Sequence, residues 1–124
     1  MATVLLAEDD ADIRFLVTFK LEQAGHAVRG FGDGASALAD ARVHRPDLAV
    51  LDILMPGMSG LDVCRELRGD PATAAVPVIM LTAAAQEADI AAGFAAGADD
   101  YIVKPFSPRD FALRVKAVLA RVQA

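Results

Sequence analysis

Apolar positions along the chain fall into two patterns that alternate from one end to the other. Short runs rich in Val, Leu and Ile predict strands, and longer stretches with apolar residues at helical spacing predict helices. The predicted strands are about Thr3 to Ala7, His26 to Gly30, Leu48 to Asp52, Pro77 to Leu81 and Tyr101 to Val103. The predicted helices are about Ala11 to Ala24, Gly34 to His44, Leu61 to Arg68, Gln86 to Ala96, and Pro108 to near the C-terminus. This alternation is typical of βα units around a parallel sheet.

Residues at the helix ends support these limits. Gly25 is expected to end the first helix. In "SPRD", Ser107 is the expected N-cap of the last helix, Pro108 its first residue, and Asp110 the partner in a capping box. The first helix is expected to bury one apolar face, which comprises Ile13, Leu16, Val17, Leu21 and Ala24.

The length favours an open sheet. A chain of 124 residues fits one domain, covering residues 1–124, whereas a closed eight-unit barrel needs about twice that length. Open α/β sheets form a three-layer sandwich and place their sites beyond the carboxyl ends of the strands, where the strand order reverses. The polar residues expected at those ends are Glu8, Asp9, Asp52, Thr82 and Lys104.

Composition and charge narrow the classes of function. The net charge of −5, with Lys and Arg scattered along the chain, argues against non-specific nucleic-acid binding, which needs a basic surface. The N-terminal "MATVLLAEDD" lacks the basic flank of a secretory signal, and the longest apolar run, at 76–85, is too short to span a bilayer. We therefore expect a cytoplasmic location and no membrane contact.

Three carboxylates gathered at one sheet edge would repel one another unless a cation offsets their charge. A hard divalent ion such as Mg²⁺ suits them, because it prefers oxygen ligands and takes one or two carboxylates directly. Asp52 follows the most apolar strand, where its carboxylate can attack a phosphorus held at that ion. Thr82 would supply a hydroxyl, and Lys104 a cation, to the phosphoryl oxygens. Singly, each residue is more simply a cap, a turn or a solvated residue, so their joint placement carries this interpretation.

These motifs resemble the receiver domain of two-component response regulators. The similarity lies in the acid pair after the first strand, "DILMPGMSG" at 52–60, "LTA" at 81–83 and "YIVKPF" at 101–106, and it covers the whole chain with the order and spacing of the family. It implies a flavodoxin-like, or CheY-like, sandwich of five parallel strands in the order 2-1-3-4-5 with five helices. It also implies a role in two-component or phosphorelay signalling, without catalysis beyond the protein's own phosphorylation and slow dephosphorylation.

The resemblance further implies how the phosphoryl group is received. Asp52 would accept it from a histidine kinase, a histidine phosphotransfer protein or a small phosphodonor. Asp9, Asp52 and the backbone carbonyl of Leu54 would bind Mg²⁺ or Mn²⁺ directly, and Glu8 would act largely through a metal-bound water. Thr82 would bind phosphoryl oxygens.

Lys104 would also bind phosphoryl oxygens, and by the same resemblance its peptide bond to Pro105 is expected to be cis. Tyr101 would be the aromatic switch residue. A phosphoryl group adds negative charge and strong acceptors, which would draw Thr82 and Lys104 inward and leave space for Tyr101 to fill. This movement would change the surface of the fourth helix, fifth strand and fifth helix, through which such domains also pair.

Leu54 and Ala84 occupy positions that in the family tune water access to the acyl phosphate. Neither side chain can hold a water, so we expect a phosphoryl lifetime longer than in receivers with polar residues at both positions. The two histidines are expected at the surface, since His26 opens a strand and His44 lies near a helix end. Cys64 cannot form a disulfide within the chain, and it is expected to pack on its helix, although a reactive thiol is the alternative.

Other functions fit the sequence less well. A haloacid-dehalogenase-like phosphatase also uses an Asp nucleophile and Mg²⁺, but it needs a second acid where this chain has Leu54. A nucleotide or flavin module needs a glycine- or hydroxyl-rich loop after the first strand, where this chain has acids. A receiver-like docking module that works without phosphorylation remains an alternative. The sequence also leaves open the kinase, the downstream protein, and whether the chain acts alone or within a longer regulator.

Overall fold

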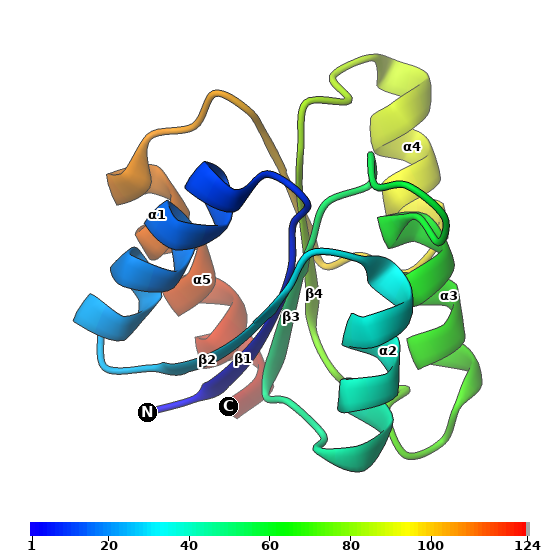
Figure 1. Cartoon of the computed structure of the whole chain (residues 1–124), viewed down its shortest axis with the longest axis horizontal. Coiled ribbons are helices and arrows are strands. Elements are labelled where there is room, and N and C mark those ends of the chain that lie inside the picture. Colours follow the sequence, from blue (N-terminus) through cyan, green and yellow to red (C-terminus); the bar gives the residue numbers. More distant parts are fainter. Residues whose placement is uncertain (124) are drawn as a thin grey trace.

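Five parallel strands form a sheet at the centre of the molecule, with helices on both of its faces (Figure 1). The computed structural model describes residues 1–123. The strands are β1 (Thr3–Ala7), β2 (Ala27–Phe31), β3 (Leu48–Leu51), β4 (Val78–Thr82) and β5 (Asp100–Val103). The helices are α1 (Ala11–Gln23), α2 (Gly34–Val43), α3 (Gly60–Gly69), α4 (Glu87–Ala95) and α5 (Pro108–Gln123). The order β2-β1-β3-β4-β5 confirms the predicted sandwich and its strand order.

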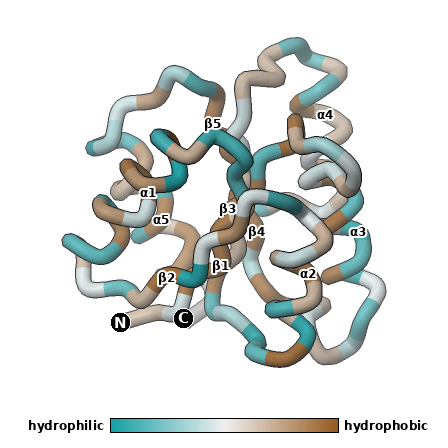
Figure 2. The backbone as a smooth tube through the Cα atoms, in the orientation of Figure 1, coloured by the Kyte–Doolittle hydropathy of each residue, from teal (hydrophilic) through white to brown (hydrophobic). Residues whose placement is uncertain are grey.

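The helices form two layers, with α1 and α5 on one face of the sheet and α2, α3 and α4 on the other (Figure 1). Successive residues of a strand point to opposite faces, so each central strand supplies both layers. In β1, Val4 and Leu6 pack in one cluster with Phe111 of α5, and Leu5 and Ala7 pack in a second cluster with residues of α2 and α3. Figure 2 shows hydrophobic residues concentrated along the central strands. Within residues 1–123, none of the helices has the length and apolar character needed to cross a membrane.

Several element limits differ from the prediction by one or two residues, which is ordinary where elements fray. The difference at β4 affects the site. Thr82 is the last residue of this strand rather than the first residue after it, because it pairs in register with Val103 of β5. β3 ends at Leu51, so Asp52 stands immediately beyond the sheet.

The buried face of α1 is narrower than predicted. Val17 and Leu21 are buried and Ile13 is half-buried, but Leu16 is 42% exposed and Ala24 is exposed. In its layer α1 has α5 beside it on one side only (Figure 1), so side chains on its outward side remain in solvent. The prediction was therefore wrong for Leu16 and Ala24.

Cys64 and the two histidines were expected to have no chemical role. Cys64 is fully buried on α3 and its thiol donates to the carbonyl of Ala96 (3.3 Å), which confirms its packing role. Burial raises the pKa of this thiol further. His44 is exposed as predicted, but His26 is half-buried, because its Nδ1 accepts a hydrogen bond from the N–H of Ala2 (3.1 Å) beside the start of β1.

The start of α5 follows the prediction for Ser107 and Pro108, whereas the carboxylate of Asp110 pairs with Arg114 instead of completing the expected capping box. Pro108 is its first residue, and the N–H of Asp110 donates to Oγ of Ser107 (3.3 Å). The carboxylate of Asp110 accepts from Nε of Arg114 (3.0 Å), one turn further along the helix. At the other end of the chain, α1 ends just before Ala24 and Gly25, as predicted.

Candidate functional site

The acids predicted from the strand ends meet at one edge of the sheet. Glu8 and Asp9 follow β1, Asp52 follows β3, and these two strands are neighbours whose last residues, Ala7 and Leu51, are in register. One carboxylate oxygen from each of the three acids lies within 4.8 Å of the other two. The β-sheet register, rather than any local sequence pattern, brings them together.

The three acids differ in exposure. Glu8 and Asp52 are 1% and 3% exposed, whereas Asp9 faces solvent. Asp10, the next residue, does not join this cluster. It is the N-cap of α1, and its carboxylate accepts hydrogen bonds from the N–H groups of Asp12 and Ile13 (2.9 and 3.2 Å). The run of acids therefore divides into a buried acid, an exposed acid and a helix cap.

Lys104, the residue after β5, reaches the two buried acids. Its Nζ lies 2.8 and 2.9 Å from the two carboxylate oxygens of Glu8, and 3.0 Å from Oδ2 of Asp52. The side chain of Lys104 is itself only 14% exposed. Its charge thus offsets the two acids within the folded chain.

Burial shifts the protonation of this group. Desolvation raises the pKa of Glu8 to about 7, although the hydrogen bond from Lys104 opposes the shift, and the nearby Asp52 adds to it. Burial alone would lower the pKa of Lys104, but its hydrogen bonds to Glu8 and Asp52 outweigh burial and raise it. Glu8 is therefore harder to ionise than an ordinary carboxyl, while the charged form of Lys104 beside it is favoured.

The backbone holds Thr82 and Lys104 side by side. The N–H of Lys104 donates to the carbonyl of Thr82 (2.9 Å), and Thr82 is fully buried. Oγ1 of Thr82 accepts from the N–H of Ala84 (3.3 Å). The peptide bond between Lys104 and Pro105 is cis, as predicted.

The segment after Asp52 is fixed by a local hydrogen bond and a close backbone contact. The N–H of Leu54 donates to Oδ1 of Asp52 (3.0 Å), while the Leu54 side chain is 56% exposed. Gly60, at the start of α3, lies so near the Asp52 carbonyl that a Cβ there would collide with it. A glycine at this position lets α3 begin directly beneath the loop that carries Asp52.

Tyr101 lies in β5, on the side of the sheet covered by α4. It is 7% exposed, and its hydroxyl donates to the carbonyl of Ala84 (2.6 Å). The residue expected to act as a switch is therefore already withdrawn from the surface.

Two contacts of this site were not predicted from the sequence. One is the pairing of Lys104 with Glu8, since Lys104 was expected to contact phosphoryl oxygens. The other is Arg14 of α1, whose Nη1 donates to the carbonyl of Glu8 (2.7 Å). The position of Arg14 follows from how α1 crosses the sheet, for which the sequence carries no local signal.

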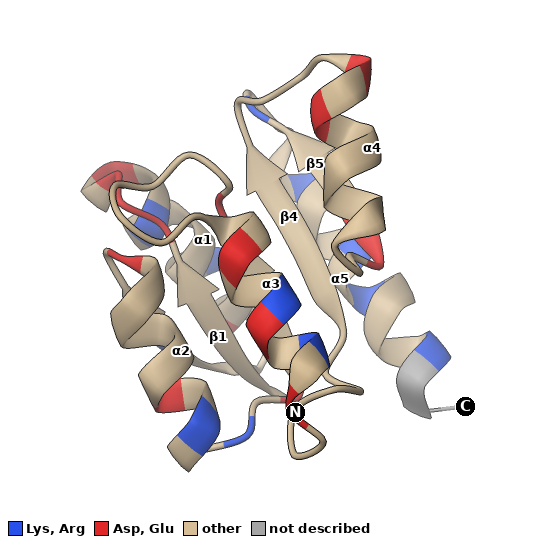
Figure 3. Ribbon diagram, turned by 90° about the vertical axis from the view of Figure 1, so that its right-hand side faces the viewer, with Lys and Arg blue, Asp and Glu red and all other residues tan. Residues whose placement is uncertain are grey.

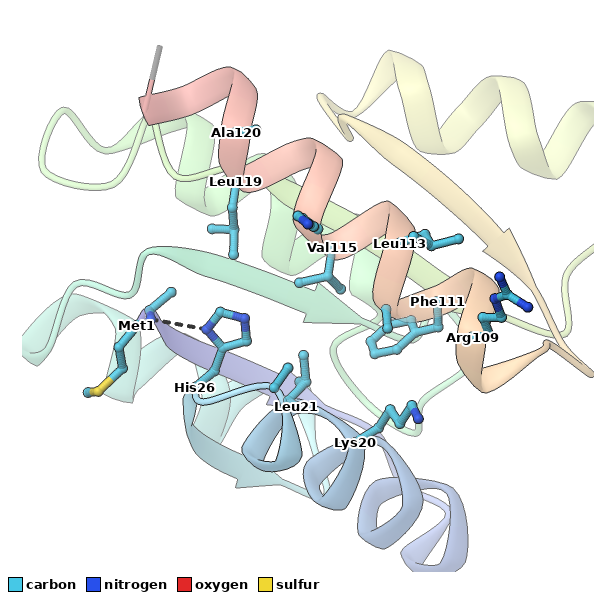
Figure 4. Close-up of a pocket in the computed structure, with 14 residues that line it drawn as sticks. Met1, Lys20, Leu21, His26, Arg109, Phe111, Leu113, Val115, Leu119 and Ala120 are labelled. Atoms are coloured by element: carbon cyan, nitrogen blue, oxygen red, sulfur yellow. Dashed lines mark hydrogen bonds between the residues drawn. The ribbon is translucent and has the colours of Figure 1, made fainter.

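A pocket lies apart from these acids, between α1 and α5, with a volume of about 780 Å³ (Figure 4). It is lined by apolar side chains such as Leu21 and Phe111, with Lys20, Arg109 and Lys116 among its polar groups. No carboxylate occurs among the described residues that line it. It therefore lacks an acceptor carboxylate, and the candidate site is the acid cluster.

Charges elsewhere on the molecule are mixed in sign. Figure 3 shows acidic and basic positions interleaved along α3, and the ion pairs there, such as Arg65 with Asp62 (3.6 Å), lie at the surface. Such exposed pairs contribute little to stability.

A parallel sheet of this order, with acids and a lysine at its switch point, defines an open α/β sandwich whose candidate site lies beyond the carboxyl ends of its strands. The model of the response regulator receiver domain family matches residues 4–116, and the chain belongs to this family.

Curated relatives agree with this assignment. The chain is 45% identical over 118 residues to the DNA-binding response regulator MtrA of Mycobacterium tuberculosis (strain ATCC 25618 / H37Rv), covering 95% of this chain and 50% of MtrA. It is 48% identical over 118 residues to the transcriptional regulatory protein ResD of Bacillus subtilis (strain 168), covering 95% of this chain and 48% of ResD. The chain thus spans about half the length of the curated relatives it matches.

Solved structures have the same fold over their whole length. A putative response regulator from Chloroflexus aurantiacus J-10-fl aligns with a TM-score of 0.92 at 38% identity, covering 96% of this chain and 98% of that one. A CheY-like receiver domain from Methanospirillum hungatei JF-1 aligns with a TM-score of 0.93 at 28% identity, covering 99% and 97%. These likenesses confirm the CheY-like fold.

Membership of the family has direct consequences for function. The chain carries a receiver domain of two-component signalling and not a conventional enzyme. The phosphatase alternative requires a conventional enzyme, so family membership argues against it. A receiver domain implies a histidine kinase as partner. The acidic cluster of Glu8, Asp9 and Asp52 is typical of the magnesium site of receivers.

Proposed function

We propose that residues 1–124 form one phosphoacceptor switch, in which Asp52 accepts a phosphoryl group from a histidine kinase, a histidine phosphotransfer protein or a small phosphodonor. The observation that carries this proposal is the meeting of three carboxylates and one lysine at the switch point of the sheet. An oxygen of Asp52 forms a bond to phosphorus while the bond to the donor's leaving group breaks and the leaving group departs with the electron pair. The product is an acyl phosphate on Asp52.

The donor set fits a hard divalent cation. Its atoms are carboxylate oxygens, and the exposed Asp9 leaves one side open to water and to a phosphodonor. We propose that Asp9, Asp52 and the backbone carbonyl of Leu54 bind Mg²⁺ or Mn²⁺ directly, with Glu8 acting through water. When bound, Mg²⁺ supplies positive charge that offsets the carboxylates and the phosphoryl oxygens.

Lys104 and Thr82 would bind the phosphoryl group once it is on Asp52. Lys104 is already within 3.0 Å of Asp52, and Thr82 is held beside it by the backbone. The added negative charge would draw the ammonium of Lys104 away from Glu8 and the hydroxyl of Thr82 away from Ala84. This change is transmitted to the surface made by α4, β5 and α5, which is the proposed contact for a downstream protein or a second copy of the chain.

The proposed setting of this switch is the cytoplasm. MtrA is described as DNA-binding, but this chain carries a net charge of −5, which disfavours binding to nucleic-acid phosphates, so we propose a protein as its direct partner.

Incubation with acetyl phosphate and Mg²⁺, followed by intact mass, tests this proposal. We expect a gain of one phosphoryl group that disappears in Asp52→Asn and persists in Asp12→Asn, a matched change of an exposed acid outside the cluster. If acetyl phosphate gives no gain, a phosphorylated histidine kinase is the second donor. A chain that both donors leave unmodified would instead be a docking module, and a gain that survives Asp52→Asn would place the phosphoryl group on another residue.

A further inference from the structure

The ring of Tyr101 lies in a close-fitting space between β5 and α4. Three groups define this space, which we call the ring seat: Gly93 of α4, the side chain of Met80 of β4, and the carbonyl of Ala84. A Cβ built on Gly93 would lie 2.7 and 2.8 Å from ring carbons Cε2 and Cδ2 of Tyr101 and 3.7 Å from Cγ of Met80. Real Cβ atoms do not approach a ring so closely, so any residue larger than glycine conflicts with the seated ring.

Gly93 is unfavourable for the helix that contains it. Glycine inside a helix costs about 1 kcal/mol relative to alanine, and the other small residues of α4 are alanines. Gly93 is nevertheless the buried residue of this helix. The space that it leaves for the ring is the structural gain that offsets its low helix propensity.

The seated ring coexists with the closed ion pair of the site. Tyr101 donates to Ala84 while Lys104 is paired with Glu8 and Asp52. The ring therefore occupies its seat without the movement of Lys104 that phosphoryl binding would require.

We propose that Gly93 is the positioning residue that holds Tyr101 in the ring seat, and that the ring is seated before any phosphoryl group reaches Asp52. The expected order of events at the switch changes accordingly. Phosphorylation would act through Thr82 and the segment at Ala84, on a ring already withdrawn, rather than by pulling an exposed ring inward. The consequence of the seated ring for signalling rests on the proposed function, whereas the location of the Tyr101 ring does not.

The chain offers a clean probe of the ring, because it has one Tyr and no Trp. Tyrosine fluorescence and its quenching by acrylamide therefore report Tyr101 alone. Burial, with the charges of Asp89 and Asp52 adding to it, also raises the pKa of this phenol, so spectrophotometric titration gives a second readout.

The test compares wild type with Gly93→Ala, and with Gly69→Ala as a matched control, because a Cβ on Gly69 meets nothing within 4 Å. We expect the ring to resist quenching in wild type and in Gly69→Ala, both before and after acetyl phosphate. In Gly93→Ala, quenching should increase severalfold and the phenol pKa should fall toward its ordinary value. A wild-type ring that becomes shielded only after phosphorylation, or a ring that stays shielded in Gly93→Ala, would overturn the proposal.

A second measurement keeps the test decisive if Gly93→Ala alone fails to fold. It compares the effect of Gly93→Ala on Tm in wild type and in a protein that lacks the Tyr101 ring. In Tyr101→Leu, adding Gly93→Ala should raise the Tm, because alanine favours the helix once the ring is absent; in wild type the same change should lower it. The same sign in both backgrounds would contradict a steric role for Gly93. Intact mass after acetyl phosphate treatment is recorded in parallel. A failure of Asp52 to gain the phosphoryl group would count against the proposed function, while the quenching data would still decide the position of the ring.

Discussion

Glu8 and Asp9 are adjacent in the chain but lie in opposite environments. Glu8 is 1% exposed and bound to Lys104, whereas Asp9 faces solvent. Both acids follow the last residue of β1, and their carboxylates gather at the same edge of the sheet, so the pair supplies one buried and one open carboxylate there. The buried member bears the cost of desolvation, and the open member stays accessible to a cation.

Glu8→Gln should stabilise the metal-free protein at alkaline pH. The folded state raises the pKa of Glu8 from 4.5 to about 7, so it favours the protonated carboxyl. The stability that the protonated form contributes is fully present below about pH 4.5 and is lost as the pH rises through 7. Gln imitates the protonated form, so its advantage should grow between these values, to roughly 3 kcal/mol at pH 8.

Urea unfolding at pH 4.5 and pH 8 with a chelator present measures this difference. Glu66→Gln, on the exposed face of α3, is the matched control for the loss of one carboxylate outside the cluster. If Glu8→Gln were the less stable protein at pH 8, the attraction of Lys104 would outweigh the desolvation of Glu8, and the assigned direction of its pKa shift would be wrong.

Leu54 and Ala84 bear on the lifetime of the proposed acyl phosphate. The Leu54 side chain is 56% exposed, and neither it nor Ala84 has a group that can orient an attacking water. We therefore expect slower self-hydrolysis than in a Leu54→Asn, Ala84→Glu variant of the same chain. Decay of the phosphorylated mass after removal of the donor measures it, and complete loss within seconds in the unaltered chain would contradict the prediction.

At the scale of elements, the end of β1 and the start of α1 determine which acids work together. Asp9→Ala should abolish Mg²⁺-dependent phosphorylation, because it removes the open carboxylate of the cluster. Asp10→Ala should leave phosphorylation in place and lower stability by about 1 kcal/mol, because it removes the N-cap of α1. Intact mass and thermal unfolding of both variants measure these outcomes. If the two variants behaved the other way round, Asp10 rather than Asp9 would be the acid that works with Glu8 and Asp52.

The elements were predictable from the sequence because apolar period and helix ends are local properties. The contacts between elements were less predictable. Lys104 and Glu8 are 96 residues apart, and their pairing depends on a strand order that the apolar pattern does not encode. The exposure of Leu16 likewise depends on the position of α1 in its layer, and the seat of Tyr101 depends on one glycine across the α4 interface.

At the scale of the whole molecule, the acid cluster opposes folding and would favour cation binding for the same reason. Two buried carboxylates and an exposed one share a single lysine within the cluster, so their repulsion is only partly offset. A cation that binds this cluster in the folded state alone must raise global stability by mass action. Binding and folding are therefore linked, even though the cluster occupies one edge of the sheet.

Mg²⁺ should accordingly stabilise the wild-type chain against unfolding. At ten times its Kd the ion contributes about 1.4 kcal/mol, which corresponds to a rise of several degrees in Tm for a domain of this size. Asp52→Asn should be at least as stable as wild type without Mg²⁺, because it relieves repulsion, but its Tm should respond little to the ion. Asp12→Asn should keep the full response, since Asp12 lies outside the cluster. Thermal unfolding across a Mg²⁺ titration measures all three proteins, and an equal rise in Tm for Asp52→Asn would place the bound ion elsewhere on the molecule.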